Sequence, residues 1–298
     1  MANGFRKIEP LRNITNRSLK ENKKPTLTNE EMVVYKSQQA YDRREICMVH
    51  RYSKKVFEYF VSLDKPYVYS SGTISWEARS ELVDWIIGIH HRLELSNETL
   101  FLSIALIDRF LMARDIPPSK LQLVGITALA IACKFEEVVC PTLQNLIILA
   151  ENRMSEEDIK KAEKYMLHTL NYDILFSCPL NFLRKCSKSN NYERKSRNIA
   201  KYLLELSTLF ESLNSYSSSI KAATAMYLAR KITQQDQCKN LFALYSEHTN
   251  EDIKDCFNSY IDVITSPIPY TNIISKYDTQ KYSFAPSYVK EHALNNFC

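Results

Sequence analysis

Apolar residues recur every three or four positions through most of this chain, which is the pattern of amphipathic helices. After a loop that ends at Ile74, five such patterns follow one another. We expect the corresponding helices at 75–95, 96–114, 117–137, 142–150 and 155–171. The third contains the segment LQLVGITALAIAC, which is apolar on all faces, so its helix should lie at the centre of its domain.

A second series of five helical patterns begins at Pro179. Its third pattern is Ala-rich and ends at Ala229-Arg230, 96 residues after the equivalent Cys133-Lys134 of the first series. The closing patterns also match, because TNEDIK at Thr249 lies 94 residues after SEEDIK at Ser155. Two nearly equal offsets that join like to like indicate a duplicated unit. We therefore predict an all-α fold with two five-helix units in tandem.

The remaining segments lie on either side of the two units. Residues 1–40 are polar and basic without a lasting period, which is typical of a flexible tail. Tyr52, Val56, Tyr59 and Phe60 recur at helical spacing, so we expect an extra N-terminal amphipathic helix. The predicted organisation is a tail at 1–40, an N-terminal helix at 41–65, the five-helix units at 66–176 and 177–265, and a mostly irregular C-terminal tail at 266–298.

The composition argues against catalysis and against metal binding. The chain has only 4 glycines, so it lacks the glycine-rich loops that bind nucleotide phosphates. Its 6 histidines show no HExxH spacing, no Ser/His/Asp or Cys/His set stands out, and its 8 cysteines form no CxxC pair. We therefore expect no enzyme activity, no metal, no cofactor and no disulfide framework.

The net charge of +5 is unevenly distributed along the chain. Residues 1–40 hold eight Lys/Arg and four Asp/Glu, which leaves +1 for residues 41–298 and argues against a nucleic-acid-binding surface there. No stretch of about 18 apolar residues is present, and the segment MANGFRKIEP lacks the apolar core of a signal peptide, so we expect no membrane association. The cysteine usage is typical of a reducing compartment, and we expect the nucleus and the cytoplasm.

Four charged residues of the first unit lie on otherwise apolar helical rows. An unpaired buried charge costs several kcal/mol, so pairing is the expected arrangement. Arg79 and Asp108 are expected to form an ion pair within the unit, between its first and second helices. Lys134 and Glu163 are expected to join the third helix to the fifth. Lys134 lies at a helix end beside Phe135, where a Lys/Glu pair and an exposed aromatic ring make a docking point for another protein.

The blocks around these charges resemble the cyclin box in order and spacing. In the first unit they are Arg79 with LVDW at 82–85, NETL at 97–100, IDRFL at 107–111, KLQLVG at 120–125, KFEE at 134–137 and Glu163. The second unit is similar to mitotic B-type cyclins in PLNFLRK at 179–185, AKYLLELS at 200–207 and KYD at 276–278. The resemblance covers roughly residues 45–285 and implies two tandem cyclin boxes, in agreement with the repeat.

The resemblance implies a protein without a catalytic site of its own that binds and activates a cyclin-dependent protein kinase, at the G2/M transition of the cell cycle. By the same resemblance, Lys134 and Glu163 bind the kinase's regulatory helix. The implied apolar contacts come from Phe135, Leu167, Tyr172, Tyr52 and Val56. For Tyr52 and Val56, packing on their own domain is an equally open interpretation.

Cyclins are also similar in carrying a patch on the first helix that docks motifs of kinase substrates and inhibitors. This chain keeps Leu82, Trp85 and Gln122 of that pattern. Glu81 replaces an apolar residue, and a carboxylate in an apolar groove should weaken the binding of apolar side chains. A standard docking patch is therefore not expected.

The basic tail contains two short segments that resemble degrons. Lys20, Glu21 and Asn22 match the KEN box read by the anaphase-promoting ubiquitin ligase. Leu11, Ile14 and Asn16 belong to a segment similar to the end of a destruction box, which is degenerate because Ile8 stands where arginine is expected. The alternative interpretation is a basic tail for nuclear import or solubility.

Other functions are also compatible with a double helical box. One is a transcriptional cyclin that binds a kinase, and another is a DNA-binding double box like that of general transcription initiation factors. The low net charge of residues 41–298 argues against DNA binding, and the match of the second unit favours a cell-cycle role.

Overall fold

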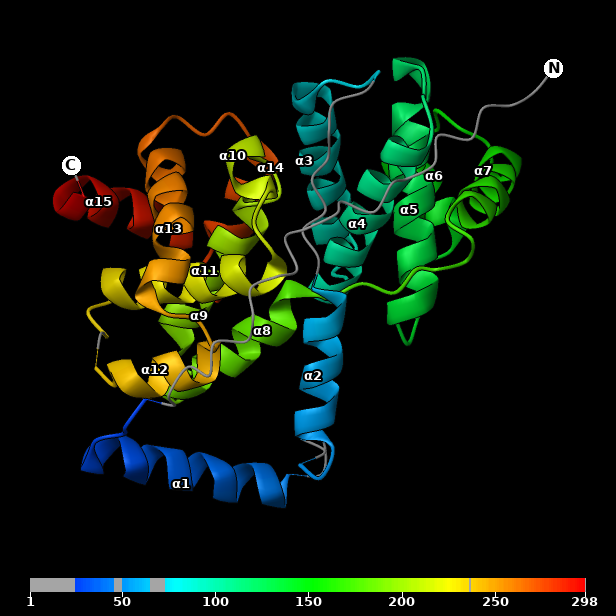
Figure 1. Ribbon diagram of the computed structural model, residues 1–298. Helices are drawn as coiled ribbons and strands as arrows, with labels where there is room; N and C mark the ends of the chain where they lie inside the picture. Colours follow the sequence, from blue (N-terminus) through cyan, green and yellow to red (C-terminus); the bar gives the residue numbers. More distant parts are fainter. Residues whose placement is uncertain (1–24, 46–49, 65–72, 236, 298) are drawn as a thin grey trace.

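The computed structural model describes residues 25–45, 50–64, 73–235 and 237–297 (Figure 1). Within these ranges the chain is helical and contains no strand. The predicted all-α fold with two tandem units is confirmed, and the units lie side by side in Figure 1. The helices of the first are α3 (Trp76–Arg92), α4 (Asn97–Ala113), α5 (Leu121–Glu136), α6 (Leu143–Leu149) and α7 (Glu156–Thr169).

The second unit repeats this order with one short insertion. Its helices are α8 (Pro179–Cys186), α9 (Arg194–Leu206), α11 (Ser218–Ile232), α12 (Lys239–Ser246) and α13 (Asn250–Thr265), with the short α10 (Glu211–Asn214) before α11. Three-residue and four-residue 3₁₀ turns lie at η2 (Pro118–Lys120), η3 (Ser187–Asn190) and η4 (Gln280–Tyr282).

The central helices α5 and α11 occupy equivalent positions in the two units. Helix α5 packs against α3, α4 and α7, and its residues from Val124 to Cys133 are all buried. Helix α11 packs against α8, α9 and α13 in the same way. The closing helices α7 and α13 both begin with a capping box, formed by Ser155 with Asp158 and by Thr249 with Asp252. The repeat read from the sequence is therefore a structural repeat.

The prediction of a flexible tail through residue 40 is wrong for its last part, because α1 (Asn29–Arg44) is a helix that lies along the second unit (Figure 1). One carboxylate oxygen of Glu31 accepts hydrogen bonds from the backbone N–H groups of Asn240, at 2.9 Å, and Leu241, at 3.1 Å. Asp42 forms a 2.5 Å ion pair with Lys188. These contacts with α12 and η3 stabilise a helix whose own apolar pattern is too weak to predict it.

The expected helix at 41–65 is shorter than predicted, because α2 covers Ser53–Leu63 and α1 already ends at Arg44. The prediction of a mostly irregular segment after 265 is also wrong. Helices α14 (Thr271–Tyr277) and α15 (Ala285–Phe297) form there. Helix α14 packs against α3 of the first unit and α9 of the second. A seven-residue helix has too few turns to show a hydrophobic period in the sequence. Whether α14 forms therefore depends on its tertiary contacts.

The approach of α14 to α3 depends on the absence of a side chain at Gly88. An added Cβ there would lie 2.6 Å from Asn272 Oδ1. Asn272 cannot swing away freely, because its Nδ2 and backbone N–H both donate to Asp84, at 3.0 and 3.2 Å. We expect Gly88→Ala to lower the free energy of unfolding by about 1–2 kcal/mol, through forced displacement of α14. Urea denaturation measures this effect.

The matched control for this prediction is Gly88→Ala in an Asn272→Ala background. Without the obstructing side chain, alanine's higher helix propensity should make the same change neutral or stabilising by about 0.5–1 kcal/mol. An equal loss in both backgrounds would contradict the packing explanation.

None of the helices within the described ranges has the length and apolar character that crossing a membrane requires. In the same ranges, His, Cys, Asp and Glu side chains form no group of three or more that could hold a metal ion.

Candidate protein-binding face

Lys134 and Glu163 form an ion pair at the surface, between the last turn of α5 and the middle of α7. The Lys134 Nζ donates to both carboxylate oxygens of Glu163, at 2.6 and 2.8 Å. The Lys134 side chain is 48% exposed and that of Glu163 is 16% exposed. Since an ammonium group has three N–H donors, one donor of Lys134 is left for another molecule.

Exposed apolar side chains lie next to Lys134 in the sequence and after α7. Phe135 is 50% exposed, and Tyr172 and Leu175 are 68% and 49% exposed. Leu167 is only partly accessible, because it packs against the hydrophobic core. Of the three residues predicted for apolar contact on this unit, Phe135 and Tyr172 are therefore open to a partner, and Leu167 mainly supports α7.

Glu137, just after α5 and two residues after Phe135, anchors the C-terminal end of this helix. Glu137 Oε1 accepts from the Ser96 backbone N–H at 2.8 Å and from the Thr99 hydroxyl at 2.5 Å. Burial raises the pKa of Glu137, but these hydrogen bonds outweigh burial and lower its pKa overall. The carboxylate therefore stays ionised and ties the end of α5 to the start of α4.

Helix α2 turns one apolar face inward and another outward. Phe57 packs edge-on against Phe182 at 5.4 Å between ring centroids, and the Lys185 ammonium lies 3.3 Å from the Phe57 ring centroid. Tyr52 and Val56, in contrast, are 59% and 43% exposed. The interpretation that these two residues pack on their own domain is wrong, because Phe57 and Phe60 make those contacts instead.

Helix α2 is also anchored at its C-terminal end. The carboxylate of Asp64 accepts hydrogen bonds from the backbone N–H groups of Ser218, at 2.9 Å, and Ser219, at 3.2 Å. These are free N–H groups of the first turn of α11, which a carboxylate stabilises. The helix extends from the junction of the two units (Figure 1), and these hydrogen bonds hold its C-terminal end against α11.

Tyr59 is a residue of this face that the sequence-based site did not include. It is 48% exposed and lies three residues after Val56, on the same side of α2. The helical spacing of Tyr52, Val56 and Tyr59 was the available signal. Leu175, which follows α7, carried no such periodic signal.

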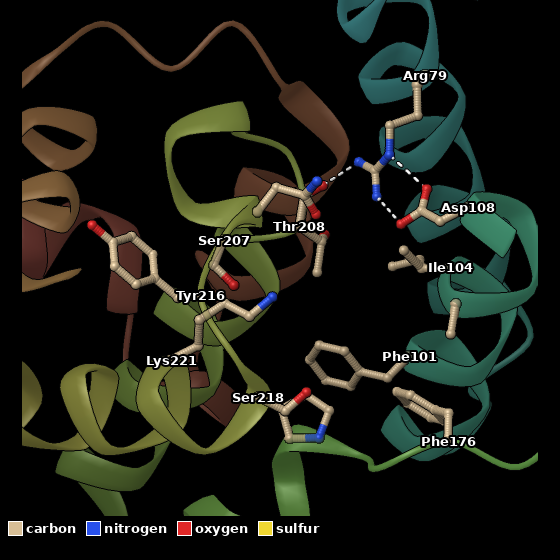
Figure 2. Close-up of a pocket in the computed structure, with 13 residues that line it drawn as sticks. Arg79, Phe101, Ile104, Asp108, Phe176, Ser207, Thr208, Tyr216, Ser218 and Lys221 are labelled. Carbon is tan, nitrogen blue, oxygen red and sulfur yellow. Dashed lines mark hydrogen bonds and ion pairs between the residues drawn. The ribbon is translucent and has the colours of Figure 1, made fainter. Parts of the chain in front are cut away.

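Arg79 and Asp108 form a buried ion pair, shown in Figure 2. The Arg79 Nε and Nη2 atoms donate to the two oxygens of Asp108, at 2.8 and 2.7 Å. The guanidinium also donates to the backbone carbonyl of Thr208 in the second unit. The pair expected within the first unit therefore also joins the two units.

The residues of the altered docking pattern, which lie on α3 and at the start of α5, differ in exposure. Leu82 is 4% exposed and belongs to the core, whereas Glu81 is exposed. Trp85 is partly buried, and Gln122 accepts a long hydrogen bond of 3.4 Å from Arg153. The surface here carries a carboxylate, and the weakened docking patch stays a prediction. The degron residues Lys20, Glu21, Asn22, Leu11, Ile14 and Asn16 lie outside the described residues.

Two tandem five-helix units define a double helical box, and its first unit carries a surface Lys/Glu pair and exposed apolar side chains. Family models match both units: the cyclin N-terminal domain at residues 48–175 and the cyclin C-terminal domain at 178–290. The chain belongs to the cyclin family.

Mitotic cyclins of fungi are among the curated proteins to which this chain is similar in sequence. The chain is 35% identical over 263 residues to the G2/mitotic-specific cyclin cdc13 of Schizosaccharomyces pombe, covering 86% of this chain and 55% of the relative. It is 36% identical over 241 residues to the G2/mitotic-specific cyclin-B of Emericella nidulans, covering 79% and 50%. The chain thus spans about half the length of these relatives.

A solved structure shows the same fold. The viral cyclin of herpesvirus saimiri aligns with a TM-score of 0.61, covering 71% of this chain and 97% of the other, at 16% identity.

Proposed function

We propose that this protein is a regulatory subunit that binds and activates a cyclin-dependent protein kinase and controls the G2/M transition. The observation that carries the proposal is the Lys134–Glu163 pair at the surface, with the exposed Phe135 next to Lys134 in the sequence and the exposed Tyr172 just after α7. The names of the relatives, which are G2/mitotic-specific cyclins, support the cell-cycle role and the stage.

The proposed action needs binding energy and no chemistry on this chain. A kinase's catalytic Lys–Glu pair assembles only when its regulatory helix is in place. A partner that favours the active arrangement by about 5.5 kcal/mol moves its population from 1:99 to 99:1. Asp64 and Glu137 anchor the elements of the binding face before the partner binds. Less conformational entropy is therefore lost on binding. The protein is accordingly proposed to have no catalytic activity of its own.

The direct test uses the purified full chain and a cyclin-dependent kinase. We expect the two to form a complex and histone phosphorylation by the kinase to rise by orders of magnitude. A complex without activation would contradict the proposed activation and support binding alone. The absence of a complex would contradict the whole proposal.

We also propose that the protein acts in the nucleus and cytoplasm and is destroyed through its N-terminal segment by the anaphase-promoting ubiquitin ligase. Deleting residues 1–24, before α1 begins, should lengthen the half-life at mitotic exit several-fold. Alanine at Lys20, Glu21 and Asn22 should have the same effect if the KEN match is the signal. If both variants had the half-life of the wild type, the proposed destruction through the N-terminal segment would be contradicted.

A further inference from the structure

Helix α1 is attached to the second unit by polar side chains, whereas part of its apolar surface faces solvent. Glu31, Gln38 and Asp42 are buried, and Val33 and Tyr41 are exposed. Among the described residues, none of those in α1 belongs to the hydrophobic core or packs against it. Because apolar burial is the main force that holds helices to a protein body, α1 is attached more weakly than the helices of the two units.

Several buried polar atoms at this contact lack a hydrogen-bond partner among the described residues. They are Gln38 Oε1, Asp42 Oδ1, Asn190 Oδ1 and Nδ2, and the Tyr192 hydroxyl. Burial raises the pKa of Tyr192 to about 12, and the negative charge of Asp42 contributes to this rise, so the phenol lies near that carboxylate. A buried polar atom without a partner destabilises the contact, and water satisfies it once α1 moves away.

Three polar anchors nevertheless hold α1 in place. The Glu31 carboxylate accepts from the first turn of α12, the Gln38 Nε2 donates to Asn191 Oδ1 at 2.7 Å, and Asp42 pairs with Lys188. Two of the three anchors depend on a carboxylate charge, which strengthens a hydrogen bond. A 16-residue helix is marginal in water by itself, so α1 should unfold when these anchors break.

The N-terminal end of α2 lacks comparable contacts with the two units. Phe57 packs against α8 and Asp64 binds the first turn of α11, so the contacts lie toward the C-terminal end. Residues 53–56 are exposed, and α2 projects away from the units in Figure 1. Only residues 45–52 join α1 to this projecting end. Since so short a stretch has a limited reach, docking of α1 restricts where the end can lie.

We propose that α1 is a detachable strap that positions the projecting end of α2. The docked strap restrains the end that carries Tyr52 and Val56, and release of the strap gives this end more freedom. Both units stay folded on release, because α1 adds nothing to their hydrophobic core. The consequence for the kinase rests on the proposed function: a docked strap pre-organises Tyr52 and Val56, so its release weakens the complex.

Hydrogen exchange of the full chain tests the strap. The amides of α1 should exchange at least a hundredfold faster than those of the buried α5. Glu31→Gln/Asp42→Asn removes both anchoring charges, and we expect at least tenfold faster exchange in α1 and several-fold faster exchange in α2, with α5 unchanged. The matched control Glu30→Gln/Glu45→Gln removes two charges at exposed positions of the same segment and should leave all three helices unchanged.

The same two variants test the consequence for the kinase. Glu31→Gln/Asp42→Asn should weaken binding to a cyclin-dependent kinase three- to tenfold, and the control should bind like the wild type. Undiminished affinity of the anchor variant would overturn the effect on the kinase-binding face.

The exchange data decide the strap independently of the kinase. Exchange in α1 as slow as in α5, or unchanged by Glu31→Gln/Asp42→Asn, would overturn the strap. Faster exchange in α1 with unchanged exchange in α2 would overturn the positioning of α2. A wild-type chain that binds no kinase would contradict the proposed function, and the exchange of α1 and α2 would still decide this inference.

Discussion

Lys276→Met should lower the free energy of unfolding by about 3–5 kcal/mol, the largest stability effect that we expect in this protein. Lys276 on α14 and Glu205 on α9 form an ion pair with both side chains 1% exposed. The Nζ atom donates to the two carboxylate oxygens at 2.9 and 2.7 Å, and the Tyr277 hydroxyl donates to one of them at 2.6 Å. Removing the lysine leaves a buried carboxylate without its cation, which is why the cost is high. Urea or guanidinium denaturation measures it.

The double variant Glu205→Leu/Lys276→Met separates the cost of a broken pair from the value of the pair itself. Replacing both partners by apolar residues of similar size is often close to neutral, although here the Tyr277 hydroxyl loses its acceptor. We expect the double variant to lie within about 2 kcal/mol of the wild type. Lys254→Met, at an exposed position, should change stability by no more than about 0.5 kcal/mol. If Lys276→Met were as stable as this control, the stabilising role of the Lys276–Glu205 pair would be contradicted.

Lys134→Ala and Glu163→Ala should each weaken binding to a cyclin-dependent kinase by about 30-fold or more, with histone phosphorylation falling accordingly. Losing one member of a charge pair that becomes desolvated in a complex costs about 2–5 kcal/mol, because the remaining charge is then buried without its partner. The fold should persist, since the pair lies at the surface, where an ion pair contributes only about 0–1 kcal/mol to stability. Pull-down, a kinase assay and thermal unfolding of each variant measure these effects.

Lys161→Ala is the matched control on the same helix. Lys161 pairs with Glu157 at 3.4 Å, is highly exposed, and lies two residues before Glu163, on a different side of α7. It should bind and activate the kinase like the wild type. Normal binding and activation by both Lys134→Ala and Glu163→Ala would show that the kinase docks elsewhere.

Much of the candidate face was predictable because its residues lie on regular helices. The cost of burying an unpaired charge pointed to Lys134 and Glu163, and the structure brings these side chains together. Helical spacing placed Tyr52 and Val56 on one side of α2, but it could not say which side faces the protein. That choice depends on Phe57, whose contacts with Phe182 and Lys185 turn the Tyr52 side outward.

The order of residues was sufficient to predict the helical class, the duplication and the central helices, because periodic burial leaves a pattern in consecutive residues. How α1 and α14 join the units depends on the tertiary structure. Glu31 and Asn240 are 209 residues apart, and Lys276 and Glu205 are 71 residues apart. No local pattern marks such partners, since each pairing exists only once the folded chain brings the two segments together and excludes water from between them.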